Sequence, residues 1–412
     1  MSPAPRGPAE AYPMLPPATA LEIVLQHARP LEAEEVEAAD ALGRVLAADV
    51  RSEEDYPAAP RSSVDGYAVR AADREPRRRV IGEVTAGHPS AVEVGPGTAQ
   101  RIMTGGVVPP GADAVVMIED TRDGDGVVEL LKPVAPGQCI HPTGMDIQRG
   151  QVILPAGTAI GPAEIGLLAT IGRVRVPVHR RPRVAVLSTG DEVVEWTEQP
   201  GPGQVRDSNR PALIAAVREA GGVPISLGRA LDREEDQRAL ITRGAREADV
   251  VITSGGVSMG ARDLIKPILA QLGTVHVGRI NFKPGKPLTF ATIGSTLVFG
   301  LPGFPVSSLV TFEVFVRPAL RALQGFAQVT RPEVPVVLEH EVKPDPVRPE
   351  YQRAIVRVVG GELRATTTGA QTSSRLLSMV GANALLKIAP GSEPLPAGAR
   401  VPALLIGEPR HG

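Results

Sequence analysis

The segment 249-DVVITSGGVSMGARDLIKPI-268 decides the fold, because it joins a buried strand to a helix through a glycine-rich turn. The run Val250-Val251-Ile252 is short, apolar and β-branched, which is typical of an interior strand in a parallel sheet. Gly255 and Gly256 allow backbone angles that other residues resist, and they let a ligand come close to the main chain. The segment therefore predicts a strand, a turn and a helix within an α/β domain.

The turn itself lacks the two familiar nucleotide-binding motifs. Its glycines do not follow the G-x-G-x-x-G spacing, and no Gly-Lys-Ser/Thr follows as in a Walker A loop. It does place free amides, the hydroxyls of Ser254 and Ser258, and the carboxylate of Asp263 beside the start of a helix. Such groups suit an anion, or an anion together with a metal ion. A tight turn without any ligand explains the local pattern equally well.

Strands and helices alternate on both sides of this segment, from about residue 180 to residue 327. Strands are predicted at "RVAVLST", "VPISLGRAL", "TVHVGRI" and "STLVFGLPG", and helices at "SNRPALIAAVREAGG", "REEDQRALITRGAREA", 263–272 and 306–323. This alternation indicates a largely parallel sheet with helices on both faces. We therefore expect a three-layer α/β domain at 178–327, with ligands bound beyond the carboxyl ends of its strands.

Composition and charge are those of an ordinary folded protein. The 412 residues are enough for several domains, and apolar residues make up 42% and charged residues 22% of the chain. The formal net charge of −2 gives no global attraction to nucleic acid or to a membrane surface. The single cysteine, Cys139, excludes an internal disulfide and a cysteine-rich metal cluster, and it fits a reducing compartment.

Neither a secretory signal nor a membrane span is visible in the sequence. The stretch 1–17, MSPAPRGPAEAYPMLPP, lacks the basic start and apolar core of a signal peptide, so we expect a disordered leader there. Apolar stretches elsewhere are too short, and too broken by glycine and proline, to cross a bilayer. We therefore expect a cytoplasmic protein.

The segments that flank the α/β domain have different patterns. Apolar residues at helical spacing predict two helices within 18–50, and 145–177 contains a further helix that starts near Pro162. These two segments are expected to form one discontinuous helical linker domain. Short β-type runs between Gly- and Pro-rich turns predict a β-rich domain at 51–144, and proline-punctuated runs predict a barrel-like β domain at 328–412. The expected fold class is multidomain, α/β plus β.

Charged side chains follow the strands of the predicted sheet or lie on a nearby turn. They are Asp191 and Glu192 after the first strand, Asp263 after the third, and Lys283 and Lys286 on the Lys-Pro-Gly-Lys-Pro turn of "NFKPGKPLTF". A solvated turn or an exposed hairpin explains each group when it is taken alone. Together with the glycine turns, they predict a site for a phosphorylated ligand and a divalent cation at the carboxyl edge of the sheet.

Two motifs outside the α/β domain have simple local explanations. In "PRSSVDGYAVRAAD", Asp65 and Gly66 are typical of a turn that opens a strand. In "RIMTGGVVPPGADAVVMIED", Thr104 precedes two glycines. A structural turn accounts for either pattern at least as well as a binding site does.

The motifs of the whole chain, taken together, resemble those of the molybdopterin molybdenumtransferase family, which includes the E domain of gephyrin. The shared motifs are "SVDGYA", "MTGGVVPPGADAVV", "LPAGTAIGPAEIGLLA", "STGDE", "DSN", "SGGVSMGARD", "KPGKP" and "LPGFPVSS". They occur in that family's order, and the resemblance extends from about residue 18 to residue 405. The α/β domain alone also resembles molybdopterin adenylyltransferases and CinA-type proteins, but the flanking domains favour the transferase.

The resemblance implies a reaction and its components. Molybdate would be inserted into adenylylated molybdopterin with release of AMP, and Mg²⁺ would be the cofactor. The dithiolene sulfurs belong to the substrate, so the protein needs no ligand cysteine. The family also implies a homodimer with the active site between subunits, and a molybdopterin adenylyltransferase as upstream partner. It implies no nucleic-acid or membrane partner.

The resemblance also assigns roles to residues by motif position. The matching positions are Asp191, Glu192, Asp263, Lys283 and Lys286 as catalytic residues; Asp65, Thr104, Asp146, Ser254, Gly255, Gly256, Ser258, Gly260, Pro302, Pro305, Arg353 and Ser373 as substrate-binding residues; and Glu192, Asp232 and Asp263 as metal ligands.

Four positions depart from the family pattern. The family usually has Asn at Phe304, Met at Val64, Arg at His141 and Glu at Met145. Loss of an arginine fork weakens anion recognition more than a histidine restores at neutral pH. Two alternatives to the transferase therefore stay open: a non-catalytic scaffold that carries molybdopterin, and a paralogue that prefers tungstate. An adenylyltransferase is a third.

Overall fold

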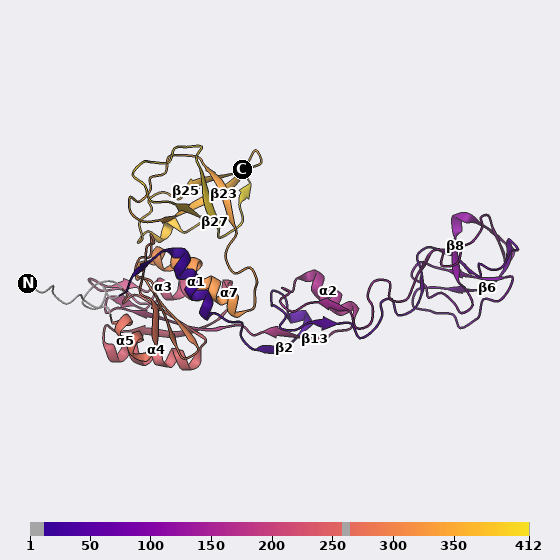
Figure 1. The fold of residues 1–412 in the computed structure, drawn as a ribbon, viewed down its shortest axis with the longest axis horizontal. Coiled ribbons are helices and arrows are strands. Elements are labelled where there is room, and N and C mark those ends of the chain that lie inside the picture. The colour runs from indigo at the N-terminus through magenta and orange to yellow at the C-terminus, as the bar shows by residue number, and fades with distance from the viewer. Residues whose placement is uncertain (1–11, 258–263, 412) are drawn as a thin grey trace, which may run out of the picture. The chain divides into compact units, whose positions relative to one another are not determined.

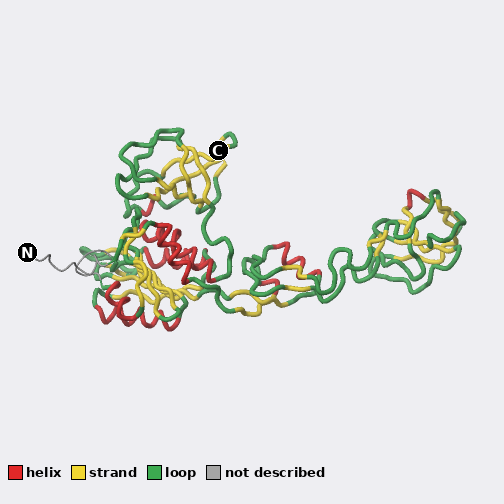
Figure 2. The backbone as a smooth tube through the Cα atoms, viewed as in Figure 1, coloured by secondary structure: helices red, strands yellow, loops and turns green. Residues whose placement is uncertain are grey.

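The computed structural model describes residues 12–257 and 264–411. The chain divides into two compact units, one formed by Met1–Glu34 with His179–Gly412 and the other by Glu35–Val178. Figure 1 labels the helices and strands, and Figure 2 shows that helices concentrate in the first unit. Within the described ranges, no helix is long and apolar enough to cross a membrane.

The first unit contains the predicted α/β domain, built on a six-stranded sheet. In spatial order its strands are β17 (Val223–Ala230), β14 (Arg183–Thr189), β18 (Val250–Ser254), β22 (Thr296–Leu301), β21 (Thr289–Ile293) and β19 (Thr274–Val277). The first four run parallel, and β21 runs in the opposite direction, because it pairs antiparallel with both β22 and β19. Ser188 lies opposite Ser254, and Ser254 lies opposite Leu301. The largely parallel sheet is confirmed, and this register brings the carboxyl ends of β14, β18 and β22 to one edge.

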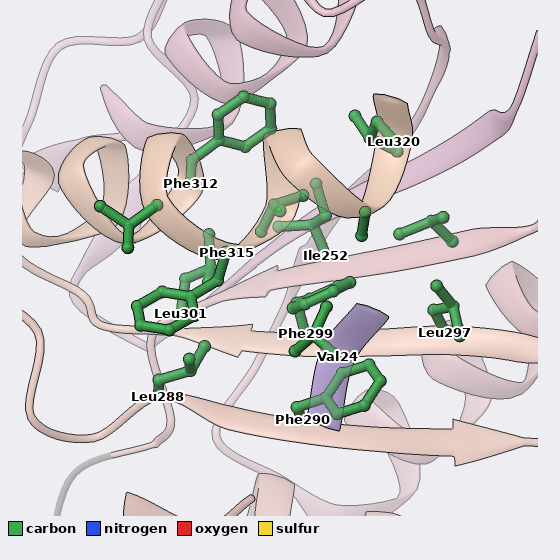
Figure 3. Close-up of a cluster of buried hydrophobic side chains, with 14 of the residues drawn as sticks. Val24, Ile252, Leu288, Phe290, Leu297, Phe299, Leu301, Phe312, Phe315 and Leu320 are labelled. Atoms are coloured by element: carbon green, nitrogen blue, oxygen red, sulfur yellow. The ribbon is translucent and has the colours of Figure 1, made fainter. Parts of the chain in front are cut away.

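Helices cover both faces of the sheet, because successive strand residues point to opposite sides. Ile252 belongs to a hydrophobic cluster with α1 (Pro17–His27), α3 (Asn209–Glu219), α6 (Pro305–Thr311) and α7 (Arg317–Leu323). Its neighbour Val251 packs instead with α4 (Glu234–Glu247) and α5 (Ile265–Leu272). Figure 3 shows the first cluster, in which the rings of Phe290 and Phe299 pack at a tilt, with centroids 5.0 Å apart.

The helix predicted at 306–323 is one run with a defect in its middle. A π-helix, Phe312–Val316, separates α6 from α7. Pro318 follows directly inside α7, and proline has no N–H to donate to the preceding turn. The widened π turn is a known way of accommodating such a break without ending a helix.

Short strands complete the α/β domain. They are β1 (Met14–Leu15), which pairs with β20 (Arg279–Ile280), and β15 (Val193–Val194), which pairs with β16 (Val205–Arg206). The predicted strand "TVHVGRI" is thus divided between β19 and β20.

An ion-pair network fixes the start of β18. Both carboxylate oxygens of Asp249 accept hydrogen bonds from Arg180 at 2.6 Å, and Oδ2 also accepts one from the Arg183 N–H at 2.8 Å. Arg180 in turn donates to Glu32 at 2.5 Å. Burial by itself raises the pKa of Asp249, but the bonds from Arg180 and Arg183 outweigh it, and the net shift is downward from 3.8.

Asp249→Asn is expected to destabilise the α/β domain by about 2 kcal/mol near neutral pH, because a charge-assisted pair is lost. A lowered pKa means that this stabilisation is present above 3.8 and is lost as pH falls through the lowered value. The difference between variant and wild type should therefore shrink in acid. Urea unfolding followed by circular dichroism measures it, and Glu247→Gln, which removes an exposed pair with Arg243, is the control. Equal losses in the two variants would contradict the prediction.

The C-terminal segment folds as a closed five-stranded barrel. Its strands are, in order, β25 (Glu362–Thr367), β23 (Glu333–Leu338), β27 (Arg400–Leu405), β26 (Ala384–Ile388) and β24 (Glu350–Val359), and β24 pairs back with β25. The short β28 (Arg410–His411) lies along β24, and a 3₁₀ helix, Leu376–Ser378, follows β25 in the chain. Alternate residues such as Val336, Ala354 and Leu386 fill the interior. The predicted barrel-like domain is confirmed.

The second unit contains a six-stranded mixed sheet. Its strands are, in order, β8 (Ala114–Met117), β5 (Gly66–Val69), β7 (Thr98–Ile102), β6 (Arg77–Val84), β10 (Val127–Leu130) and β9 (Thr121–Gly124), with a 3₁₀ turn at Ile118–Asp120. Tyr67 and Val116 lie in the cluster on one face, and Ala68 and Ile102 in the cluster on the other. The predicted β-rich character of this stretch is therefore present.

The remainder of the second unit corrects one prediction. The two helices expected within 18–50 are not both present, because only α1 forms, and it packs on the α/β domain. Beyond it the chain forms β2 (Ala33–Glu37), a 3₁₀ helix (Ala38–Asp40) and turns, so the prediction of a second helix was wrong. Tertiary pairing overrides helical spacing here: β2 pairs with β13 (Arg175–His179), and Val45 and Leu46 form bridges to Ala159 and Val178.

A small hydrophobic cluster joins the two stretches that were expected to form the linker domain. It contains Leu46 and Val50 from one and Leu168 and Val176 from the other. The ordered elements there are β3 (Val50–Arg51), which pairs with β12 (Val152–Leu154), and α2 (Pro162–Thr170). A further short pair, β4 (Arg61–Ser62) with β11 (Ile140–His141), lies within 51–144. The helix predicted to begin near Pro162 is confirmed, and the boundaries of the five segments stay predictions.

Candidate functional site

The carboxyl edge of the sheet carries the first group of predicted site residues. Asp191 and Glu192 are exposed on the turn after β14, and Asp232 is half-buried on the turn after β17. Asp191 Oδ1 accepts the N–H of Asp232 at 3.1 Å, and Asp232 Oδ1 accepts from Gln237 at 3.4 Å. The register of β14 and β17 thus makes Asp191 and Asp232 direct neighbours.

Gly255 and Gly256 are required by packing as well as by conformation. Their φ angles are 95° and 66°, a region that residues with a side chain rarely adopt. A Cβ at Gly255 would lie 2.8 Å from both the carbonyl oxygen and the hydroxyl of Thr189. The turn after β18 therefore sits directly against the end of β14, and it leaves no room for a side chain between them.

The segment "DSN" joins three strand ends. The Ser188 hydroxyl at the end of β14 donates to Asp207 at 2.5 Å. The Asn209 side-chain amide donates to Ser254 Oγ and to the carbonyl oxygen of Gly303, both at 2.7 Å. Gly303 lies beyond β22, so one short segment contacts all three turns.

The predicted lysine turn opens into a cavity of about 820 Å³ between the α/β domain and the barrel. Lys283, Lys286 and Ser307 line it from the α/β domain, and Gln371 and Ser373 line it from the barrel. The Val306 N–H donates to the Ser373 carbonyl oxygen at 3.1 Å and holds the two walls together. Ser307 belongs to α6, which begins at Pro305, so one wall of the cavity is continuous in the chain with the turn after β22.

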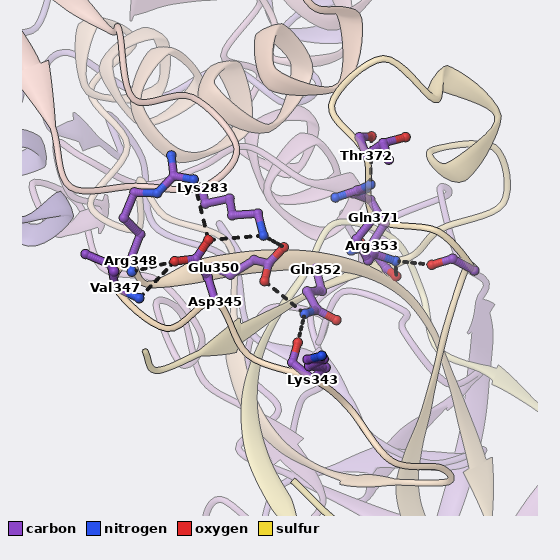
Figure 4. A network of polar contacts seen from close by, with 11 residues as sticks. Lys283, Lys343, Asp345, Val347, Arg348, Glu350, Gln352, Arg353, Gln371 and Thr372 are labelled. Carbon is purple, nitrogen blue, oxygen red and sulfur yellow. Dashed lines mark hydrogen bonds and ion pairs between the residues drawn. The ribbon is translucent and has the colours of Figure 1, made fainter. Parts of the chain in front are cut away.

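The two lysines are in different environments. Lys283 Nζ forms ion pairs with Asp345 at 3.2 Å and with Glu350 at 3.1 Å, as Figure 4 shows. Its main chain pairs with the barrel too, since its N–H donates to Pro349 O at 3.0 Å and its carbonyl accepts from Tyr351 at 2.7 Å. Lys286 has no ion pair with any residue that the structure describes. It is the lysine that remains available to a ligand.

Two charged groups of the barrel stand beside this cavity with shifted pKa values. Hydrogen bonds from the Val347 and Arg348 N–H groups, with a smaller part from Lys283, lower the pKa of Asp345 from 3.8 to about 2. Arg353 is fully buried, and desolvation lowers its pKa to about 10. Its Nε and Nη2 donate to Ser378 and Thr372, whereas Nη1 is buried with no hydrogen-bond partner.

The predicted residues of the second unit form a separate group. Asp65 Oδ1 accepts from the Thr104 N–H at 2.6 Å and from its hydroxyl at 2.8 Å, and these bonds lower the pKa of Asp65. Asp146 is exposed, and its N–H donates to Tyr56. His141 Nδ1 lies 3.1 Å from the Met145 sulfur, so the two departures from the family pattern contact each other.

The structure thus brings together the turns after β14, β17, β18 and β22, and it places Lys283, Lys286 and Ser373 around one cavity with Arg353 directly behind. Asp65 and Thr104 also meet. Ser258, Gly260 and Asp263 lie outside the described residues. Within those residues, no three His, Cys, Asp or Glu side chains are grouped so as to hold a metal ion. The metal set Glu192, Asp232 and Asp263 stays a prediction.

Sequence reasoning assigned no role to several residues that shape this region. Asn209 is the last residue of the motif "DSN" and had no predicted role in the site, although it contacts two strand-end turns. Asp345 and Glu350, which hold Lys283, lie in "PDPVRPEYQR". The charged residues between prolines in that stretch were the available signal.

Comparisons with known proteins place the chain in a family. The MoeA N-terminal region (domain I and II) matches residues 15–172, the probable molybdopterin binding domain 185–322, and the MoeA C-terminal region (domain IV) 335–406. A molybdopterin molybdenumtransferase of a Nostoc species is 38% identical over 377 residues, which are 88% of this chain and 86% of that protein. The chain belongs to the MoeA family.

Two further likenesses agree with this assignment. Gephyrin of Dictyostelium discoideum is 38% identical over an alignment of 451 residues. The alignment covers 96% of this chain and 63% of the length of that gephyrin. The crystal structure of a molybdopterin biosynthesis protein of the MoeA family from Pyrococcus horikosii matches with a TM-score of 0.82 at 35% identity. It covers 96% of this chain and 100% of that one. The family match ties this chain to molybdenum cofactor biosynthesis and confirms the resemblance seen in its motifs.

Proposed function

We propose that this protein inserts molybdate into adenylylated molybdopterin and releases AMP, as a molybdopterin molybdenumtransferase. Relatives with that name are 34–38% identical over most of the chain. The observation that carries the proposal is the cavity between the α/β domain and the barrel, in which Lys286 has no carboxylate partner among the described residues. A substrate with phosphate groups and an oxyanion needs both a cationic wall and main-chain donors.

The cavity offers the cationic wall. Lys286 supplies a positive charge, and the hydroxyls of Ser307 and Ser373 supply donors. Arg353 stands behind the lining with one guanidinium nitrogen buried and unpartnered. A buried donor without a partner costs free energy, so an anion that accepts from it, directly or through water, would be favoured. We assign molybdate to this region.

The strand-end turns offer rigid main-chain positions. Gly255 and Gly256 keep the chain free of side chains there, and Pro302 and Pro305 stiffen the adjoining turn. Pre-organised donors are worth more than mobile ones, because no ordering cost accompanies binding. We assign the nucleotide phosphates to these turns.

Magnesium belongs to the proposal as a cation bridging protein and substrate. Mg²⁺ is commonly held by one or two carboxylates together with substrate phosphates. Asp191 and Asp232 stand on adjoining turns, joined by the hydrogen bond from the Asp232 N–H to Asp191 Oδ1, and would supply these carboxylates. When bound, the ion would neutralise phosphate charge, and the residues here would orient it.

The proposal also includes a homodimer and an upstream partner. Asp65, Thr104 and Asp146 would complete the site of the partner subunit, and sedimentation velocity would test the dimer directly. The adenylylated substrate requires a preceding nucleotidyl transfer, so a molybdopterin adenylyltransferase is the proposed supplier.

Molybdate-dependent AMP release tests the function. With purified protein, adenylylated molybdopterin and Mg²⁺, we expect AMP to appear only when molybdate is added, and EDTA should suppress it. No AMP under these conditions, together with tight pterin binding, would instead support the carrier scaffold. A higher rate with tungstate would identify the tungstate-preferring paralogue, and ATP consumption with molybdopterin alone would identify an adenylyltransferase.

A further inference from the structure

We infer that Asn209 is a positioning residue, which sets the spacing of the turns after β18 and β22 for the substrate. The inference rests on the proposed function, because it concerns the site that holds the nucleotide phosphates. Asn209 is the first residue of α3, and its side chain leaves the helix toward the carboxyl edge of the sheet, where it contacts Ser254 and Gly303.

The orientation of the Asn209 amide is fixed by chemistry. The Gly303 carbonyl oxygen can only accept a hydrogen bond, so the amide nitrogen must face it. The same nitrogen donates to Ser254 Oγ, so both of its hydrogens are used, each over 2.7 Å. Asn209 Oδ1 is buried and has no hydrogen-bond partner. The residue is thus held by what it donates, and an isosteric side chain that cannot donate would not replace it.

The two bonds join turns that are also connected, among the described residues, by a backbone hydrogen bond at the end of the sheet. The Gly255 N–H donates to Leu301 O at 3.0 Å, and this is the last ladder contact between the ends of β18 and β22. Gly255 and Gly303 then lie close together, because a Cβ added at Gly303 would be only 3.6 Å from the Gly255 Cα. Beyond Leu301 the chain turns away toward α6. Asn209 therefore closes the gap between the turns at the point where the sheet no longer does.

The start of α3, which carries Asn209, is itself held in place by several hydrogen bonds and ion pairs. Asp207 accepts from the Ser188 hydroxyl and from the Arg210 N–H at 3.0 Å, and Arg210 Nε lies 3.1 Å from Asp207 Oδ2. Arg210 also pairs with Glu195. Asp207 is buried and thus anchors the start of α3 to the end of β14. The start of α3, held by Asp207, is therefore a fixed position relative to which Asn209 places the turns after β18 and β22.

Three variants test the inference. Asn209→Ala removes both donors, Asn209→Asp keeps the size but removes both donors while ionised, and Ser208→Ala alters an exposed neighbour that forms no capping bond. AMP serves as the probe, and its dissociation constant is measured by calorimetry. Hydrogen exchange is followed in peptides covering 254–257 and 301–304, and thermal unfolding reports on stability.

We expect both Asn209 variants to bind AMP about tenfold more weakly and to exchange faster in both turns, with thermal unfolding nearly unchanged and Ser208→Ala like the wild type. A protonated carboxylic acid regains one donor. The defect of Asn209→Asp, taken relative to wild type at the same pH, should therefore shrink as pH is lowered, whereas that of Asn209→Ala should not. A purely structural role in α3 would not produce this difference.

Unchanged exchange in both turns of Asn209→Ala would overturn the inference, and so would wild-type AMP affinity in that variant. If the wild-type protein itself does not bind AMP, the proposed function fails, and the exchange rates of the two turns still decide whether Asn209 positions them.

Discussion

Lys286→Met is expected to lower molybdate-dependent AMP release about a hundredfold or more, the usual effect of removing one donor from an oxyanion site. Lys286 lines the cavity between the α/β domain and the barrel and has no carboxylate partner among the described residues. Its charge is therefore available to the substrate and is not used to hold the fold. Methionine preserves the length of the side chain and removes only the ammonium group.

The fold should be almost unaffected by this change, because no ion pair is broken. Thermal unfolding of the variant is expected to match that of the wild type within a few degrees. Lys387→Met is the matched control, since it removes the same charge from an exposed pair with Glu333 on the barrel, far along the chain from the lysine turn. AMP release at near wild-type rate in Lys286→Met would show that the cavity is not the anion site.

Lys283→Met is expected to act mainly on stability, lowering the free energy of unfolding by about 3 kcal/mol. Lys283 pairs with Asp345 and with Glu350, whose side chain is only 2% exposed. Without the lysine, Glu350 keeps a hydrogen bond from Gln352 but loses the neighbouring cation in a desolvated position. The expected loss lies at the low end for a buried pair, because the Lys283 side chain itself is one-third exposed.

The double variant Lys283→Met with Glu350→Gln separates charge from packing. It should recover about half of the lost stability, since removing both partners leaves no buried charge unpaired. Lys387→Met should cost less than about 1 kcal/mol, as for other exposed pairs. If Lys283→Met instead abolishes AMP release while leaving unfolding unchanged, Lys283 acts on the substrate, as the motif assignment predicts, and its ion pairs are incidental.

The same experiment has a pH dependence with a definite sign. The pKa of Asp345 is lowered from 3.8 to about 2, so its contribution to stability is present above 3.8 and is lost as pH falls through about 2. The gap between wild type and Lys283→Met should accordingly narrow in that acid range. A gap that widens there would contradict the assigned ion pair.

The α/β domain could be predicted from the sequence because the local spacing of apolar residues identifies its strands and helices. Apolar residues form a short continuous run in strands such as Val250–Ile252 and recur at helical spacing in helices such as α4. Strands and helices that alternate along the chain allow few topologies. The stretch at 36–46 was misjudged for the opposite reason. Its apolar residues fit a helix by spacing, but their partners lie more than a hundred residues away, and no local pattern reports such pairing.

Motif glycines show how packing and function overlap in sequence. Gly66 in "SVDGYA" stands where a Cβ would lie 1.9 Å from the Val116 carbonyl oxygen, so the close approach of β5 and β8 alone demands glycine. The neighbouring Asp65 is instead exposed and bonded to Thr104. Two adjacent residues of one motif thus have different reasons to be there.

The candidate site could be predicted as a set of turns, because parallel strands bring their carboxyl ends together. The different environments of the two lysines could not be predicted. Lys283 and Lys286 stand on the same turn, and only the barrel, over fifty residues later in the chain, supplies the carboxylates that engage one of them. Asn209 escaped notice for the same reason, since its partners become neighbours only in the folded sheet.

The pairing between Lys283 and the barrel bears on how this protein can be cut or recombined. Two main-chain hydrogen bonds cross that joint, and beside it the ring of Phe282 lies 4.8 Å from that of Tyr351. A truncation before residue 330 would uncover this aromatic surface and leave edge-like backbone groups bare, which is a recognised route to aggregation. Exchanging the barrel for that of a relative would require compatible residues on both sides of this contact, in the α/β domain and in the barrel.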